Sequence, residues 1–80
     1  MSIDRNKARH WSTNRIREEI TDLRHKVTKE NDDIEWCWSE IGRIRPDNEG
    51  PRQSLSKAIE KSHRIIEDVN NDITFLKSLL

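Results

Sequence analysis

The sequence has almost no residues that interrupt an α-helix. It contains two Gly and two Pro among 80 residues, and Pro46, Gly50 and Pro51 fall within one short segment. Because Gly and Pro are the strongest local breakers of regular structure, this segment predicts one loop with a long uninterrupted element on either side. Gly42 is the remaining member of this small set, and it lies just before the same loop.

Cysteine and long apolar runs are also scarce, which excludes several classes of protein. The single cysteine, Cys37, excludes an internal disulfide. Hydrophobic residues make up 31% of the chain and charged residues 38%, and no apolar run approaches the length of a membrane span. The N-terminus lacks the apolar core of a signal peptide. We therefore expect a cytoplasmic protein with no membrane partner.

The apolar residues that are present form two ladders with heptad spacing. Steps of four and three alternate in both ladders, which places each on one stripe of an α-helix. The first ladder is Ile16, Ile20, Leu23, Val27, Glu30, Ile34, Cys37, Ile41 and Ile44, and the second is Leu55, Ile59, Ser62, Ile66, Val69, Ile73, Leu76 and Leu80. We predict an all-α antiparallel helical hairpin, similar to a coiled coil, with helices over residues 13–45 and 51–80 and a loop at 46–50.

The two ladders match each other when the chain is folded about the loop. Apolar layers then meet apolar layers along the hairpin, with weaker layers where Cys37 meets Ser62 and where Glu30 meets Val69. Polar groups in a helical seam often fix its register at a cost in stability.

The ends of the predicted helices carry capping signals. Ser12 or Thr13 can cap the first helix, because a hydroxyl at this position accepts a hydrogen bond from an early backbone N–H. The second helix can begin at Pro51, whose fixed φ suits a first turn, or after Ser54 as an N-cap.

Residues 1–11 form a polar, basic segment outside the first ladder. Extending the heptad backwards from Ile16 meets only polar residues, so we expect a frayed or disordered N-terminal arm before a hairpin over residues 12–80.

The second helix carries more apolar surface than one partner helix can cover. A stripe this wide is typical of a helical bundle. Two hairpins that dimerise into a four-helix bundle would bury it, although a long parallel coiled coil obeys the same pattern. We expect a homodimer that forms through the flanking residues Ala58, Ile65, Phe75 and Leu79.

Trp36 and Trp38 flank Cys37 in the first helix. Tryptophan is enriched among the residues that dominate binding energy at interfaces. We therefore expect these two side chains to bind a partner, which is either a second copy of the chain or another protein.

Charge is balanced over the chain but unevenly distributed. Residues 1–29 carry eight Lys/Arg against four Asp/Glu, a charge of +4, and residues 30–50 carry two against seven, a charge of −5. Basic groups interleaved with an aromatic ring can contact phosphates and a base. Nucleic-acid binding is therefore an alternative function, through Arg5, Lys7, Arg9, Trp11, Arg15 and Arg17.

No motif for catalysis, a cofactor or a metal occurs. Cys37 and His63 come within reach in the predicted register, but a thiolate nucleophile also needs a pocket and an orienting group. The three histidines are scattered without metal-ligand spacing. We expect a non-enzymatic interaction module: an adaptor, regulator, inhibitor or assembly subunit.

Pro46-Asp47-Asn48 is similar to the turn of type III secretion needle subunits, which are helical hairpins of comparable length. Here Glu49 and Gly50 intervene before Pro51, and no residue role is carried over. The resemblance implies a secretion-system needle-like or chaperone-like hairpin subunit as a second alternative.

Overall fold

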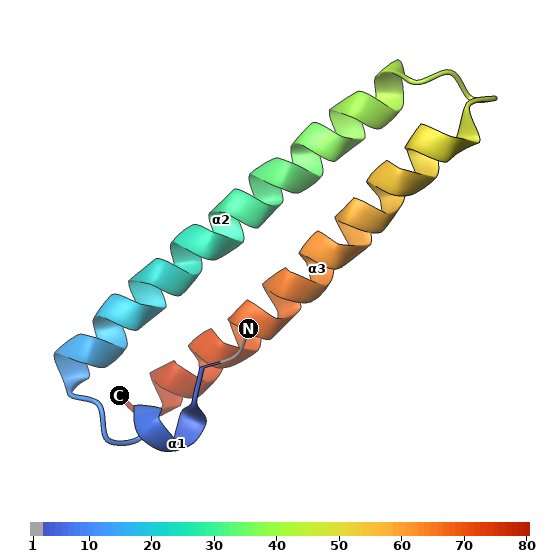
Figure 1. The fold of residues 1–80 in the computed structure, drawn as a ribbon. Helices are drawn as coiled ribbons and strands as arrows, with labels where there is room; N and C mark the ends of the chain where they lie inside the picture. Colours follow the sequence, from blue (N-terminus) through green and yellow to red (C-terminus); the bar gives the residue numbers. More distant parts are fainter. Residues whose placement is uncertain (1–2) are drawn as a thin grey trace.

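Residues 3–80, which a computed structural model describes, form two long antiparallel helices and a short third one (Figure 1). In chain order these helices are α1 (Arg5–Ala8), α2 (Thr13–Arg43) and α3 (Glu49–Ser78), with no strand in this range. The molecule is elongated, with principal extents of 54 × 17 × 13 Å. The expectation of an all-α chain with two long packed helices is confirmed.

The ends of α2 follow from its sequence. The Ser12 hydroxyl accepts a hydrogen bond of 3.2 Å from the Arg15 N–H, as the capping pattern predicts. At the other end Ile44 is extended, with φ −85° and ψ 138°, so α2 stops at Arg43 and not at the predicted residue 45. Arg45 precedes Pro46, and a residue before proline disfavours helical backbone, so a helix that continues through residues 44 and 45 is disfavoured.

The start of α3 also differs slightly from the prediction. The helix begins at Glu49, two residues before Pro51, with Asn48 at the N-cap position. Pro51 thus lies inside the first turn. The first backbone N–H groups of a helix have no intrahelical partner, so the missing N–H of Pro51 removes no helical bond there.

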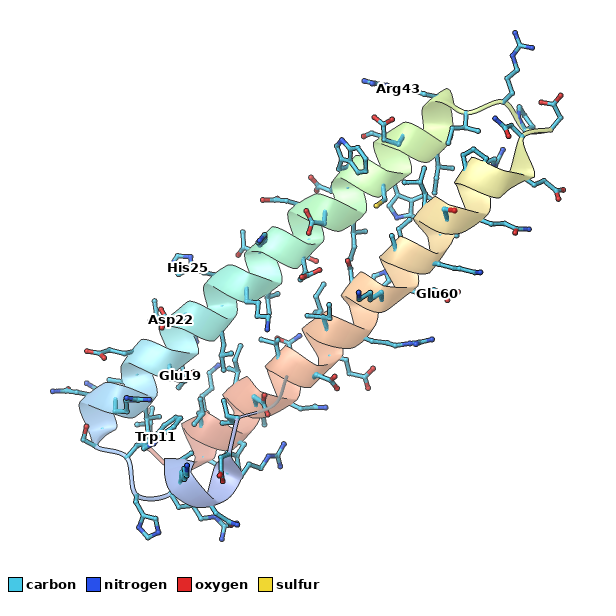
Figure 2. The ribbon with its side chains drawn as sticks, in the orientation of Figure 1. Trp11, Glu19, Asp22, His25, Arg43 and Glu60 are labelled. Atoms are coloured by element: carbon cyan, nitrogen blue, oxygen red, sulfur yellow. The ribbon has the colours of Figure 1, made fainter. Side chains whose placement is uncertain are left out.

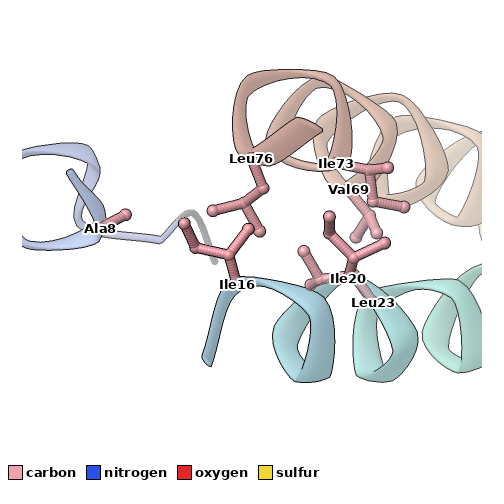
Figure 3. Packing of buried hydrophobic residues seen from close by; sticks show 7 residues of the cluster. All are labelled: Ala8, Ile16, Ile20, Leu23, Val69, Ile73 and Leu76. Carbon is pink, nitrogen blue, oxygen red and sulfur yellow. The ribbon is translucent and has the colours of Figure 1, made fainter. Parts of the chain in front are cut away.

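The seam between α2 and α3 divides into two apolar clusters. The larger, at the open end of the hairpin, contains buried residues of all three helices: Ala8, Ile16, Ile20, Leu23, Val69, Ile73 and Leu76 (Figure 3). The smaller, nearer the loop, is built on Ile34, Cys37 and Ile59. Half-buried Glu30 lies between them along α2. Most outward positions of α2 are polar, and Asp22 and His25 point away from α3 (Figure 2).

The N-terminal arm, the segment from Ile3 to Trp11, differs from the expectation of a frayed or disordered segment. Asp4 caps α1 by accepting from the N–H groups of Asn6 and Lys7, at 3.1 and 3.2 Å. Ala8 is fully buried in the larger cluster. A single helical turn is not stable alone, so tertiary contact with the end of α3 holds it. Met1 and Ser2, also part of the predicted arm, lie outside the described residues.

Substituting Leu76 tests the position of the larger cluster. Leu76 is 0% exposed, whereas Leu80, two residues beyond the end of α3 at Ser78, is 56% exposed. We expect Leu76→Ala to lower the free energy of unfolding by about 2–5 kcal/mol through lost burial and a residual cavity. Leu80→Ala is the matched control and should cost under about 0.5 kcal/mol. Urea unfolding followed by circular dichroism at one protein concentration measures both, and equal losses would contradict this packing.

Candidate functional site

The two tryptophans of α2 are both exposed, but they point to different sides of the hairpin. Trp36 is 60% and Trp38 is 58% accessible to solvent. Two positions along an α-helix differ by about 200° in direction, so neighbours of this spacing project almost oppositely. The expected pair of partner-binding residues therefore does not form one continuous surface, and each tryptophan belongs to its own side of the molecule.

Trp36 lies at an open groove between α2 and α3. The groove has a volume of about 390 Å³ and is lined from α2 by Glu30, Asp33, Trp36 and Cys37, and from α3 by Ala58, Lys61, Ser62 and Ile65. The groove thus brings together Trp36, which was expected to bind a partner, and two residues expected in self-association, Ala58 and Ile65. We call the side of the hairpin defined by Asp33, Trp36, Ala58 and Ile65 the groove face.

Phe75 and Leu79, the other residues expected in self-association, are half-buried at the open end of the hairpin and pack against the larger cluster. The guanidinium carbon of Arg5 lies 4.9 Å from the centroid of the Phe75 ring, and that of Arg9 lies 6.0 Å away. A guanidinium over an aromatic face is attracted by the ring quadrupole. The arm therefore covers part of the Phe75 ring, which was expected from the sequence to contact a second copy of the chain.

Asp72 anchors the arm and was not identified from the sequence. Its side chain is almost completely buried, and both of its polar contacts come from the arm. The Ile3 N–H donates to Oδ2 at 3.4 Å, and the Arg5 guanidinium lies 3.8 Å from Oδ1. A buried carboxylate is costly unless it is paired and hydrogen-bonded, so these contacts tie the arm to α3. The heptad offered a signal, because Asp72 falls on the apolar line of Ile65 and Leu79.

The residues expected to contact nucleic acid are not gathered into one patch. Arg5 and Arg9 lie over Phe75, and Arg15 lies 4.7 Å from the centroid of the Trp11 ring. Lys7 is exposed on α1. Arg17 instead lines a second groove, of about 220 Å³, whose other lining residues are Ile20, Thr21, Arg24, Lys77 and Leu80.

The second groove lies on the side of the hairpin that carries Trp38. Arg17, Arg24 and Trp38 are separated by multiples of seven residues, which aligns them along one side of α2. We call this side, defined by Arg17, Arg24, Trp38 and Lys77, the basic face. The hairpin thus presents an acidic and apolar groove face and a cationic basic face.

The smaller seam cluster contains Cys37, one member of the possible Cys–His pair. Cys37 is a buried free thiol, whereas His63, its possible partner, is exposed. Among the described residues, no group of three or more His, Cys, Asp or Glu is placed to hold a metal ion. Within the same range, neither long helix has a stretch apolar enough to cross a membrane.

Comparison of the chain with protein-family models, with curated proteins and with solved structures gives no match. What the chain can bind is therefore indicated only by its own surfaces.

The anchoring role of Asp72 can be tested by neutralising its carboxylate. We expect Asp72→Asn to raise the rate of tryptic cleavage after Arg9 about 5- to 30-fold, as a loss of about 1–2 kcal/mol in arm docking requires. The exposed Asp68 gives the matched control, Asp68→Asn, on the same helix. Mass spectrometry identifies the first cut, and circular dichroism should show unchanged helicity. Equal cleavage of both variants would mean that Asp72 does not hold the arm.

Proposed function

We propose that this chain is a small non-enzymatic protein–protein interaction module that self-associates through its groove face. The observation that carries the proposal is the exposed ring of Trp36 at the edge of a groove that Ala58 and Ile65 also line. An exposed aromatic side chain beside a hollow of apolar and polar groups has the composition of an interface core with a polar rim.

The marginal size of the hairpin supports the proposal. Two helices that meet along one seam bury little apolar surface, and small chains commonly gain stability by oligomerisation. Ala58 and Ile65 lie beside the seam and not within it, so a second hairpin on this side would extend the apolar core. A homodimer built in this way is a four-helix bundle, in which burial of Trp36 replaces its contact with water.

Replacing each of the two tryptophans by alanine, in separate variants, tests the proposal. We expect Trp36→Ala to raise the dissociation constant for self-association at least about 30-fold, which corresponds to a hot-spot loss of about 2 kcal/mol. Trp38→Ala is the matched control, because Trp38 is equally exposed on the opposite side. Light scattering over a concentration series gives the dissociation constant. If Trp38→Ala has the larger effect, or if the parent chain is monomeric at high concentration, the proposal fails.

Nucleic-acid binding is a second candidate function, and the basic face supports it. Arg17, Arg24 and Lys77 line one open groove there, and none of them has an acidic partner among the ion pairs of the described residues. Clustered cations of this kind can neutralise phosphates and release counterions.

The basic face is tested by the combined variant Arg17→Gln, Arg24→Gln and Lys77→Gln. If the face binds nucleic acid, the parent chain should bind an unstructured oligonucleotide with an affinity that falls steeply with salt, and the variant should lose most of that binding. Fluorescence anisotropy measures both. Neutralising Lys26, Lys29 and Lys57 gives a control with the same charge change, and equal loss in the two variants would show that net charge alone is responsible.

A further inference from the structure

The groove face has two unlike halves along the length of α3. Ala58, Ile65, Asp72 and Leu79 are each separated by seven residues, so they lie on one line along the helix. The arm docks on this line at Asp72 and on the adjacent Phe75, whereas the groove opens at Ala58 and Ile65. The face therefore has a ridge near the open end of the hairpin and a hollow nearer the loop.

The arm cannot fill the groove of its own chain while it stays docked. Fourteen residues separate Ala58 from Asp72 along α3. At about 1.5 Å per residue this separation is about 21 Å along the helix axis. The docked residues 3–11 therefore leave the part of the groove at Ala58 open to an occupant from another molecule.

The ridge and the hollow carry opposite charges. From residue 3 to residue 11 there are three Lys/Arg, at positions 5, 7 and 9, against the single acid Asp4. The groove is lined by two acids of α2, Glu30 and Asp33, against one cation of α3, Lys61, and the surrounding α2 segment from residue 30 to residue 40 carries five Asp/Glu and no Lys/Arg. The arm of one chain and the groove of another are thus opposite in the sign of their charge.

We infer that the occupant of the groove is a second copy of this chain, laid antiparallel on the first so that the docked arm of each copy enters the groove of the other. A two-fold axis across the middle of the groove face produces both contacts at once, as an isologous interface requires. A parallel arrangement would instead place arm on arm and acidic segment on acidic segment. This inference rests on the proposed self-association, and it adds the partner, its direction and the role of the arm.

Cysteine cross-linking tests the arrangement. In a Cys37→Ala background, the two exposed positions Lys7 and Ala58 are changed together, Lys7→Cys with Ala58→Cys. Disulfide-linked residues have Cα atoms less than about 7 Å apart, so the pair cannot close within one docked chain. We expect oxidation, or a short bismaleimide, to give a covalent dimer in which peptide mapping joins the arm of one chain to α3 of the other.

The single variants, Lys7→Cys alone and Ala58→Cys alone, are the matched controls. In the antiparallel dimer the two copies of Ala58 lie about 21 Å apart along the axis, and the two arms lie at opposite ends of the interface, so neither single variant should cross-link. Efficient cross-linking of Ala58→Cys alone, or a dimer in which no variant cross-links, would overturn the antiparallel arrangement.

Light scattering of the reduced proteins separates this inference from the proposed function. A reduced dimer without the expected cross-link overturns the arrangement and leaves self-association standing. A reduced monomer at high concentration overturns both. Circular dichroism of the Cys37→Ala background should match the parent chain, because Cys37 is one member of a cluster that keeps its other apolar residues.

Discussion

Burial of one narrow apolar seam between α2 and α3 is the constraint on which the rest of this structure depends. A long polar helix gains little from propensity alone, and most helical stability in proteins comes from packing of an apolar stripe. Both long helices here are rich in charge, so their apolar residues have to meet in register. The seam achieves this in two clusters with Glu30 between them. Everything outside the seam is correspondingly free to carry charge and exposed aromatic rings.

The arm is held by a different kind of contact. Apart from Ala8 and its half-buried neighbours Ile3 and Trp11, it docks through a buried carboxylate and through guanidinium groups over an aromatic ring. Such contacts are directional and sensitive to charge, whereas seam burial is not. The arm at the open end of the hairpin therefore combines apolar burial of Ala8 with these charged contacts. The two halves of the groove face differ because the described part of the arm contacts only the half that contains Asp72 and Phe75.

The separation of the molecule into two faces shapes its proposed interactions. Trp36 lies at a groove lined by apolar and acidic groups, and Trp38 lies on the same side of α2 as Arg17 and Arg24, two to three heptads away. One surface suits a second copy of the chain that offers cations and apolar contacts, and the other suits an anionic ligand. A hairpin can carry both, because successive outward positions on a helix point in different directions while the seam keeps the helices fixed. Partners that bind at these two surfaces would contact different residues and would not compete.

The sequence by itself determined the elements of this fold. The heptad ladders predicted two long helices on either side of one loop. Ser12 or Thr13 was predicted to cap the first helix, and Ser12 does so. The small Cys37 and Ser62 side chains were predicted to lie in the seam, where both are buried. These features are local or periodic, so they can be read along the chain. The exact helix ends shifted by two residues near the prolines, where neighbouring backbone preferences compete.

Only the tertiary structure decided the position of the arm and the composition of the groove. Ile3 meets Asp72 across 69 positions of sequence, and neither residue belongs to a ladder. The groove unites Trp36 with Ala58 and Ile65, which no spacing along one helix could reveal. The physical reason is the same in both cases. Periodicity records which side of a helix is buried, but a pairing between side chains of different helices depends on where the folded chain brings them together.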